Sequence, residues 1–155
     1  MTDVETLDRA FHAVMMRMVD TGQAPHYVEL AAELGTDPES GRVILHDLIS
    51  SGIPAWLHPG TDLIASFPPF NNQPTQYRIS IDGEQRWFAQ CGFEALAMRW
   101  LFPGKLVRVD APCLDCGDSL SIEMRDDEIL SISPPTIVGY SRSAVGGDAD
   151  TRAFR

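Results

Sequence analysis

Cys91 and Glu94 are the two residues whose types and spacing are best suited to chemistry. They lie where an aromatic-rich strand pattern gives way to a helix pattern. Unpaired backbone amides at the start of a helix carry partial positive charge, which favours a thiolate. A side chain three residues further on projects from nearly the same helix face. A soft nucleophile beside a proton carrier suits bond cleavage. A buried free cysteine followed by an ordinary first-turn glutamate explains the same spacing, so both interpretations stay open.

Cys113 and Cys116 form a second pattern, a Cys-x-x-Cys pair followed by Gly117. This is half of a zinc knuckle, but a closed zinc site needs four ligands. The sequence has no second Cys-x-x-Cys, and its four histidines all lie in the first half of the chain. The pair also follows a strand and a proline, which disfavours a thioredoxin-type redox role. A turn with two incidental thiols and a soft-metal site remain as interpretations.

Composition excludes several functional classes. The 155-residue chain has a formal net charge of −10 and a pI near 4.6, without a basic patch, so phosphate backbones would repel it. No apolar run approaches the roughly 18 residues of a membrane span, and the acidic N-terminus is unlike a secretory signal. We therefore expect a cytoplasmic protein that binds neither nucleic acid nor membrane. Three cysteines, an odd number, favour reduced thiols over a disulfide scaffold.

The first 67 residues predict three helices and a hairpin. Apolar periodicity indicates helices over 3–20, 27–34 and from 36 to about 50. Two short apolar runs follow, 53–57 and 63–67, joined by a turn rich in proline and glycine. This order is typical of a winged helix. The third helix is net acidic, which favours a structural or protein-contact role over DNA binding.

The remaining chain predicts a separate β-rich unit. Residues 68–76 contain three prolines and are expected to form a linker without regular structure. Residues 77–138 predict a hairpin turning at Asp82-Gly83, a helix near Cys91 and three further strands. Residues 139–155 have the composition of a disordered tail. The predicted fold class is α+β, with a winged-helix-like half followed by a mixed β-sheet half with one central helix.

Residues 68–133 resemble the organomercurial (alkylmercury) lyase family, most closely in the segment from Trp87 to Leu96. The resemblance implies that Cys91 first binds mercury, that Glu94 stands where the family usually has aspartate, and that Cys113 is structural. The implied reaction is protonolysis of a carbon–mercury bond in a small organomercurial, giving a hydrocarbon and Hg(II). It implies no organic cofactor, an exogenous thiol that accepts Hg(II), and a mercuric-ion acceptor protein as partner.

One departure from the family keeps other functions open. The family's second mercury-binding cysteine lies downstream of the matched region, and the sequence to Arg155 does not contain it. We expect a truncated or impaired lyase, or one in which Cys113 or Cys116 replaces that cysteine as a metal ligand beside Cys91. The alternatives are a non-catalytic thiol protein that binds Hg(II) or another soft metal, and a winged-helix transcription regulator.

Overall fold

The structure, a computed structural model, describes residues 2–139. It begins with three helices: α1 (Val4–Thr21), α2 (Tyr27–Leu34) and α3 (Pro38–Ser50). Each helix begins after a side chain that accepts a hydrogen bond from a first-turn amide, contributed by Asp3, His26 and Asp37. The three predicted helices are therefore confirmed.

Eight strands form one sheet in the order β1-β2-β3-β5-β4-β6-β7-β8. Their bounds are β1 (Trp56–Leu57), β2 (Ile64–Phe67), β3 (Phe70–Asn71), β4 (Tyr77–Ile81), β5 (Glu84–Ala89), β6 (Val107–Pro112), β7 (Ser119–Arg125) and β8 (Glu128–Ser133). The α+β class is confirmed, but the prediction of a mixed sheet is wrong, because every strand pairing is antiparallel. The segment between β5 and β6 contains a helix, and these two strands run in the same direction. They are not neighbours, because β4 lies between them.

The hairpin β1–β2 follows the three helices, as predicted, but the sheet continues beyond β2 into β3. The expectation that residues 68–76 lack regular structure is wrong at β3, which pairs with β2 on one side and β5 on the other. Prolines flank this short strand without occupying it, so the amides of Phe70 and Asn71 remain free to pair. The Phe70 side chain is buried and anchors the segment in the core.

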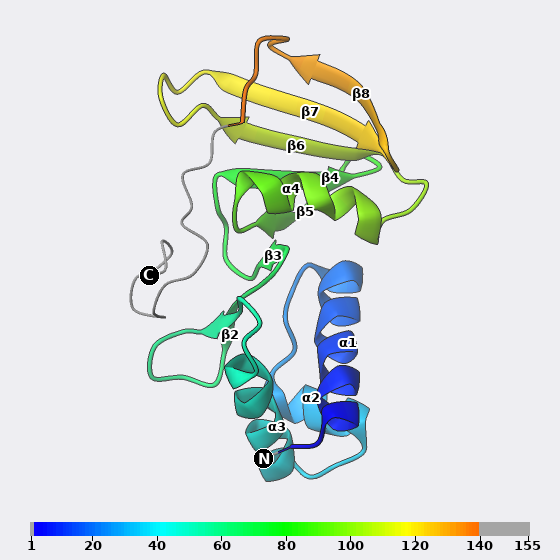
Figure 1. Ribbon diagram of the computed structural model, residues 1–155, viewed down its shortest axis with the longest axis vertical. Coiled ribbons are helices and arrows are strands. Elements are labelled where there is room, and N and C mark those ends of the chain that lie inside the picture. Colours follow the sequence, from blue (N-terminus) through cyan, green and yellow to red (C-terminus); the bar gives the residue numbers. More distant parts are fainter. Residues whose placement is uncertain (1, 140–155) are drawn as a thin grey trace.

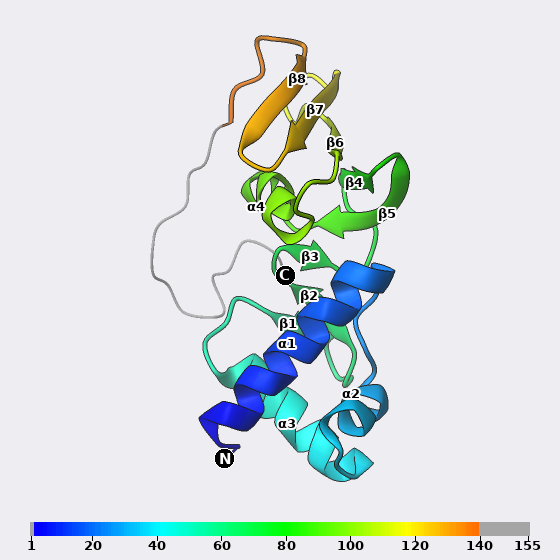
Figure 2. The ribbon, with the colours of Figure 1, turned by 90° about the vertical axis from the view of Figure 1, so that its right-hand side faces the viewer.

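One hydrophobic core runs from the helices into the sheet. The indole Nε1 of Trp87 on β5 donates to the carbonyl oxygens of Met18 at 2.9 Å and Val19 at 3.1 Å on α1. Figure 1 shows α1–α3 gathered at one end of the molecule and β6–β8 at the other, and Figure 2 shows the same elements from the side. None of the helices in residues 2–139 is long and apolar enough to cross a membrane.

A short helix, α4 (Gly92–Ala97), and a 3₁₀ turn, η1 (Met98–Leu101), cover one face of the β4–β6 region (Figure 1). The β4–β5 turn is the predicted tight one, since Asp82 and Gly83 both have positive φ, at 48° and 90°. Strand β8 is the outer strand, and all its residues are exposed. The predicted disordered tail lies outside the described residues, apart from its first residue.

Candidate active site

Cys91 occupies the junction between β5 and α4. Its backbone is extended, with φ −145° and ψ 172°, and it is the N-cap residue of the helix. Two hydroxyl groups fix the residues just before it. Thr75 donates to the Ala89 carbonyl oxygen at 2.6 Å, and the buried Ser66 donates to Gln90 Oε1 at 2.8 Å. The strand end therefore holds the cysteine in place before the helix begins.

Thr75 and Ser66 position the residues before Cys91, and no sequence pattern predicted this role. Thr75 lies in the proline-rich segment that was expected to be a linker, and its partner is a backbone carbonyl. Ser66 lies on β2, in the part of the chain assigned to a different domain, and reaches Gln90 across the sheet. Contacts of this kind leave no periodic signal in a sequence, so pattern analysis could not find them.

The structure brings Cys91 and Glu94 together, as the spacing predicted. Both side chains are partly buried, and Glu94 Oε2 is fully buried without a hydrogen-bond partner among the described residues. Burial raises the pKa of Glu94 above its usual range, and the nearby thiol and amide of Cys91 only partly offset this effect. A carboxyl group in this environment tends to hold its proton.

The ionisation of Cys91 differs from the expectation. Burial raises the pKa of its thiol, the Glu94 and Phe93 amides act in the opposite direction, and the charge of Glu94 raises it further. The prediction that the helix start would favour a thiolate is therefore wrong in its net direction. The amides are present, but desolvation and the neighbouring carboxylate outweigh them. The free site keeps its proton, which a soft metal must displace.

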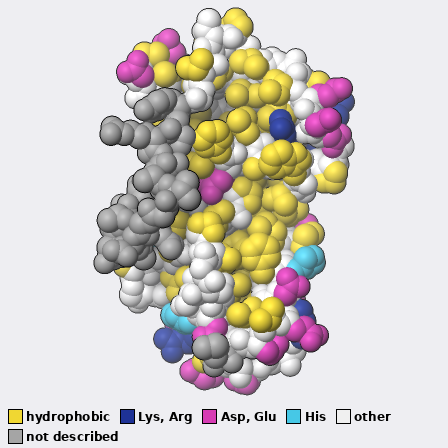
Figure 3. All heavy atoms as spheres, in the orientation of Figure 1, with side chains coloured by type: hydrophobic (Ala, Val, Ile, Leu, Met, Phe, Trp, Pro, Cys, Tyr) yellow, Lys and Arg dark blue, Asp and Glu magenta, His cyan; other side chains and the backbone are white. Residues whose placement is uncertain are grey.

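Two large apolar side chains are exposed on the elements that follow Cys91, α4 and η1. Phe93 is 63% exposed and Trp100 is 66% exposed, so both leave room for an apolar molecule to bind beside α4. Arg99 extends a guanidinium group over the Trp100 ring at 5.0 Å and directs Nη1 to Met124 Sδ at 3.7 Å. In Figure 3 hydrophobic side chains gather over the middle of the visible face, which bears few charges.

Cys113 and Cys116 lie on the β6–β7 connection, where their side chains contact each other. The described residues contain no group of three or more His, Cys, Asp or Glu side chains able to hold one metal ion. The structure thus gives no support to the expectation that Cys113 or Cys116 completes a mercury site with Cys91. The three thiols form two separate groups.

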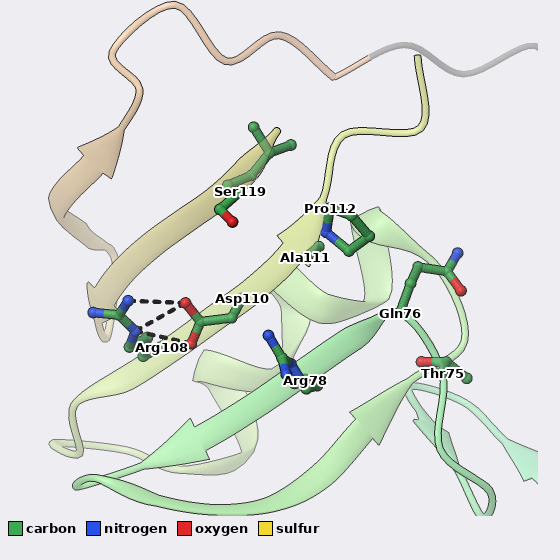
Figure 4. A pocket seen from close by; sticks show the side chains of 9 residues that line it. Thr75, Gln76, Arg78, Arg108, Asp110, Ala111, Pro112 and Ser119 are labelled. Atoms are coloured by element: carbon green, nitrogen blue, oxygen red, sulfur yellow. Dashed lines mark hydrogen bonds and ion pairs between the residues drawn. The ribbon is translucent and has the colours of Figure 1, made fainter. Parts of the chain in front are cut away.

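A pocket of about 600 Å³ lies on the opposite face of the sheet from α4. Figure 4 shows Arg78, Arg108 and Asp110 lining it, with Arg108 already paired to Asp110 at 2.8 Å. It contains none of the thiols, nor Glu94. We place the chemistry at Cys91 instead, because a thiol and a carboxyl group meet there, whereas the pocket has no thiol and its carboxylate, Asp110, is paired with Arg108.

Comparisons with known proteins identify the class. The profile of the alkylmercury lyase family (MerB) matches residues 70–153, more than half of the chain. The alkylmercury lyase of Staphylococcus epidermidis is 26% identical over 127 residues, which cover 80% of this chain and 54% of that protein. The alkylmercury lyase of Bacillus cereus is 31% identical over 65 residues, covering 42% of this chain and 29% of that protein.

The fold agrees with these relatives. A crystal structure of the mercury-bound form of MerB2 matches with a TM-score of 0.65 at 16% identity, covering 86% of this chain and 62% of that one. This chain belongs to the alkylmercury lyase family. It spans about half the length of the S. epidermidis relative.

Proposed function

We propose that this protein cleaves carbon–mercury bonds, with Cys91 binding mercury and Glu94 delivering the proton. The observation that carries this proposal is the buried, unpartnered Oε2 of Glu94 beside the Cys91 thiol. A buried oxygen without a hydrogen-bond partner destabilises the fold, so its presence indicates a functional role. Burial also favours the protonated acid that cleavage needs. Membership of the alkylmercury lyase family and the mercury-bound form of the related structure support the same assignment.

The first step exchanges a proton for mercury at Cys91. An organomercurial R–Hg–X meets the thiol, a sulfur–mercury bond forms, and X⁻ departs. The thiol proton leaves to solvent with X⁻, and Glu94 keeps the proton that its burial favours. Thiolates are soft ligands that suit a soft metal, so mercury displaces the proton even though burial raises the thiol pKa.

The second step breaks the carbon–mercury bond. Sulfur donates electron density to mercury, and the carbon–mercury electron pair takes the proton from the Glu94 carboxyl group. The products are the hydrocarbon R–H and Hg(II) bound to Cys91, with Glu94 left as a carboxylate that takes up a proton from solvent before the next turnover. No electrons leave or enter the system, so the reaction needs no redox cofactor. A second thiol ligand, supplied by a small thiol in solution, then removes Hg(II).

The organic group would lie against the exposed apolar side chains beside α4, Phe93 and Trp100. This surface contributes dispersion contacts without hydrogen bonds, so it fits aryl and alkyl groups alike. We propose a cytoplasmic role in resistance to organomercurials, with small thiols or a mercuric-ion acceptor protein taking the ion.

The N-terminal half has a structural role in this proposal. Its order of three helices and a hairpin is compatible with a winged helix, whose third helix usually contacts DNA. Here α3 carries Arg42 and His46, and both are already bound to Asp62 at 2.9 and 2.6 Å. Within α3, as the structure describes it, Arg42 and His46 are therefore not free to contact DNA. This argues against the alternative of a transcription regulator.

Arene release tests the proposal. Phenylmercuric acetate and excess cysteine are incubated with the protein, and benzene is quantified by gas chromatography. We expect catalytic benzene release from the wild type and none above background from Cys91→Ser, with circular dichroism verifying the fold of the variant. Phenylmercury that binds to the wild type without benzene release would instead establish the non-catalytic thiol protein, the second candidate function.

A further inference from the structure

The β6–β7 connection holds two thiols on a closed turn. The amide of Cys113 donates to the Asp118 carbonyl at 2.7 Å, and the amide of Gly117 donates back to the Cys113 carbonyl at 2.9 Å. Gly117 has a φ of 80°, a conformation that glycine adopts without strain. These two bonds define the path of the backbone between Cys113 and Cys116. The side chains of the two cysteines contact each other without any rearrangement of the turn.

The two sulfurs occupy different environments. Cys113 is partly buried, whereas Cys116 is exposed. The amides of Cys116 and Asp115, together with the Cys116 thiol, lower the pKa of Cys113. The Asp118 amide lowers the pKa of Cys116, but contacts with the Cys113 and Asp118 side chains outweigh it and raise the pKa overall. The pair therefore offers one sulfur that the turn partly shields and one that solvent and incoming ions can reach.

The ligand count selects the kind of metal. In residues 2–139 no group of three or more His, Cys, Asp or Glu side chains is arranged to hold a metal ion, although the Asp118 side chain contacts Cys116. Structural zinc is almost always bound by four ligands, so two thiols do not make a zinc site. A soft divalent ion that is satisfied by two thiolates matches this number and type of ligands. Two thiolates also balance its charge.

The turn lies at the same edge of the sheet as the candidate active site. Strands β5 and β6 both run antiparallel to β4, so they point in the same direction. Cys91 follows β5 and Cys113 follows β6, which places both at the carboxyl ends of these strands (Figure 1). One strand separates them, so the strand axes are about 10 Å apart. An ion leaving Cys91 therefore emerges on the edge that carries the two thiols.

We propose that Cys113 and Cys116 form a second mercury site, a dithiolate that binds Hg(II), the ion product of the reaction proposed for Cys91. Two sulfur–mercury bonds form, two thiol protons leave to solvent, and no oxidation or reduction occurs. The role as product acceptor rests on the proposed function, but binding of Hg(II) itself does not. Exposure of Cys116 lets a small thiol attack the bound ion and carry it away.

The test removes Cys91 so that the second site is measured alone. Cys91→Ser is titrated with mercuric chloride in excess cysteine, and bound mercury is counted by native mass spectrometry and by the near-ultraviolet absorption of mercury–sulfur bonds. We expect this variant to retain one mercury per chain. Adding Cys116→Ser, at an exposed position that the fold does not need, should weaken retention at least about tenfold, because a chelate becomes a single thiolate.

Two outcomes would overturn the proposal. The first is loss of mercury by Cys91→Ser alone, and the second is equal retention by Cys91→Ser and the Cys91→Ser/Cys116→Ser double variant. The titration uses inorganic mercury and no carbon–mercury bond, so its result is independent of benzene release. A protein that releases no benzene but whose Cys91→Ser variant keeps one mercury would lose the proposed function and keep the dithiolate site.

Discussion

The Glu94 carboxyl group lies beside the Cys91 thiol across the first turn of α4, with Oε2 buried and unpartnered among the described residues. Burial raises the pKa of both groups, and the charge of Glu94 raises that of Cys91 further, whereas the thiol and amide of Cys91 lower that of Glu94 in part. The free site therefore favours a thiol beside a carboxylic acid. Mercury binding changes this balance, because it displaces the thiol proton and leaves the protonated acid beside the metal.

Replacing Glu94 separates mercury binding from cleavage. Glu94→Gln keeps the size of the side chain and removes its proton, so we expect benzene release to fall by about 100-fold to 10 000-fold. Phenylmercury should still bind to Cys91. Glu39→Gln serves as the matched control, because Glu39 is also a first-turn glutamate but is exposed on α3, far from any thiol in sequence. Equal losses in both variants would exclude Glu94 as the proton donor.

The three thiols should differ in reactivity. The pKa of Cys113 is lowered by backbone amides, whereas burial raises the pKa of Cys91. The thiolate is the reactive form, so at pH 7.5 we expect iodoacetamide to modify Cys113 faster than Cys91. Peptide mass spectrometry over a time course from pH 6 to 9 measures each site. Faster modification of Cys91 throughout this range would contradict the assigned environments.

The pH dependence of stability should reveal the buried carboxyl group. Burial raises the pKa of Glu94 in the folded protein above its ordinary value of 4.5. Its contribution to stability is therefore complete below pH 4.5 and is lost as the pH rises through the folded-state pKa. We expect the free energy of unfolding of wild type, relative to Glu94→Gln, to decrease from pH 4 to pH 7.5. Urea titrations at several pH values measure this difference, and a constant difference would contradict burial of the carboxylate.

Trp87 ties the helical half to the sheet. Trp87→Phe removes the indole donor to the Met18 and Val19 carbonyl oxygens and should lower the free energy of unfolding by about 1–3 kcal/mol. Trp100→Phe is the matched control, because Trp100 is 66% exposed, and its effect should stay below about 1 kcal/mol. Chemical denaturation measures both. Similar values for the two variants would mean that the indole contact contributes little.

Local signals in the sequence predicted much of this fold. The helix expected from residue 36 and the turn expected at Asp82-Gly83 depend on signals that act over a few residues, and both are present as α3 and the β4–β5 turn. The helix start at Cys91 was predicted for the same reason. Strand β3 was missed because neighbouring prolines hide it and only the distant partner strands β2 and β5 define it. The antiparallel sheet likewise depends on β4 lying between β5 and β6, which no local pattern encodes.

The candidate site also has features that local sequence predicts and features that depend on contacts between distant elements. Spacing placed Glu94 beside Cys91 and Cys116 beside Cys113, because both pairs are local. The raised pKa of the Cys91 thiol follows from burial, which depends on how distant elements pack, and sequence analysis predicted the opposite direction. The position of Cys91 relative to the Cys113 and Cys116 pair also depends on the order of strands in the sheet.

A single turnover in heavy water tests the central claim most directly. Protein in excess over phenylmercury is incubated in D₂O with cysteine, and the benzene formed is analysed by mass spectrometry. The account predicts monodeuterated benzene from wild type, with mercury left on the protein or on cysteine, and none from Cys91→Ser. A wild-type protein that keeps the phenyl group bound through Cys91 and releases no benzene would contradict it.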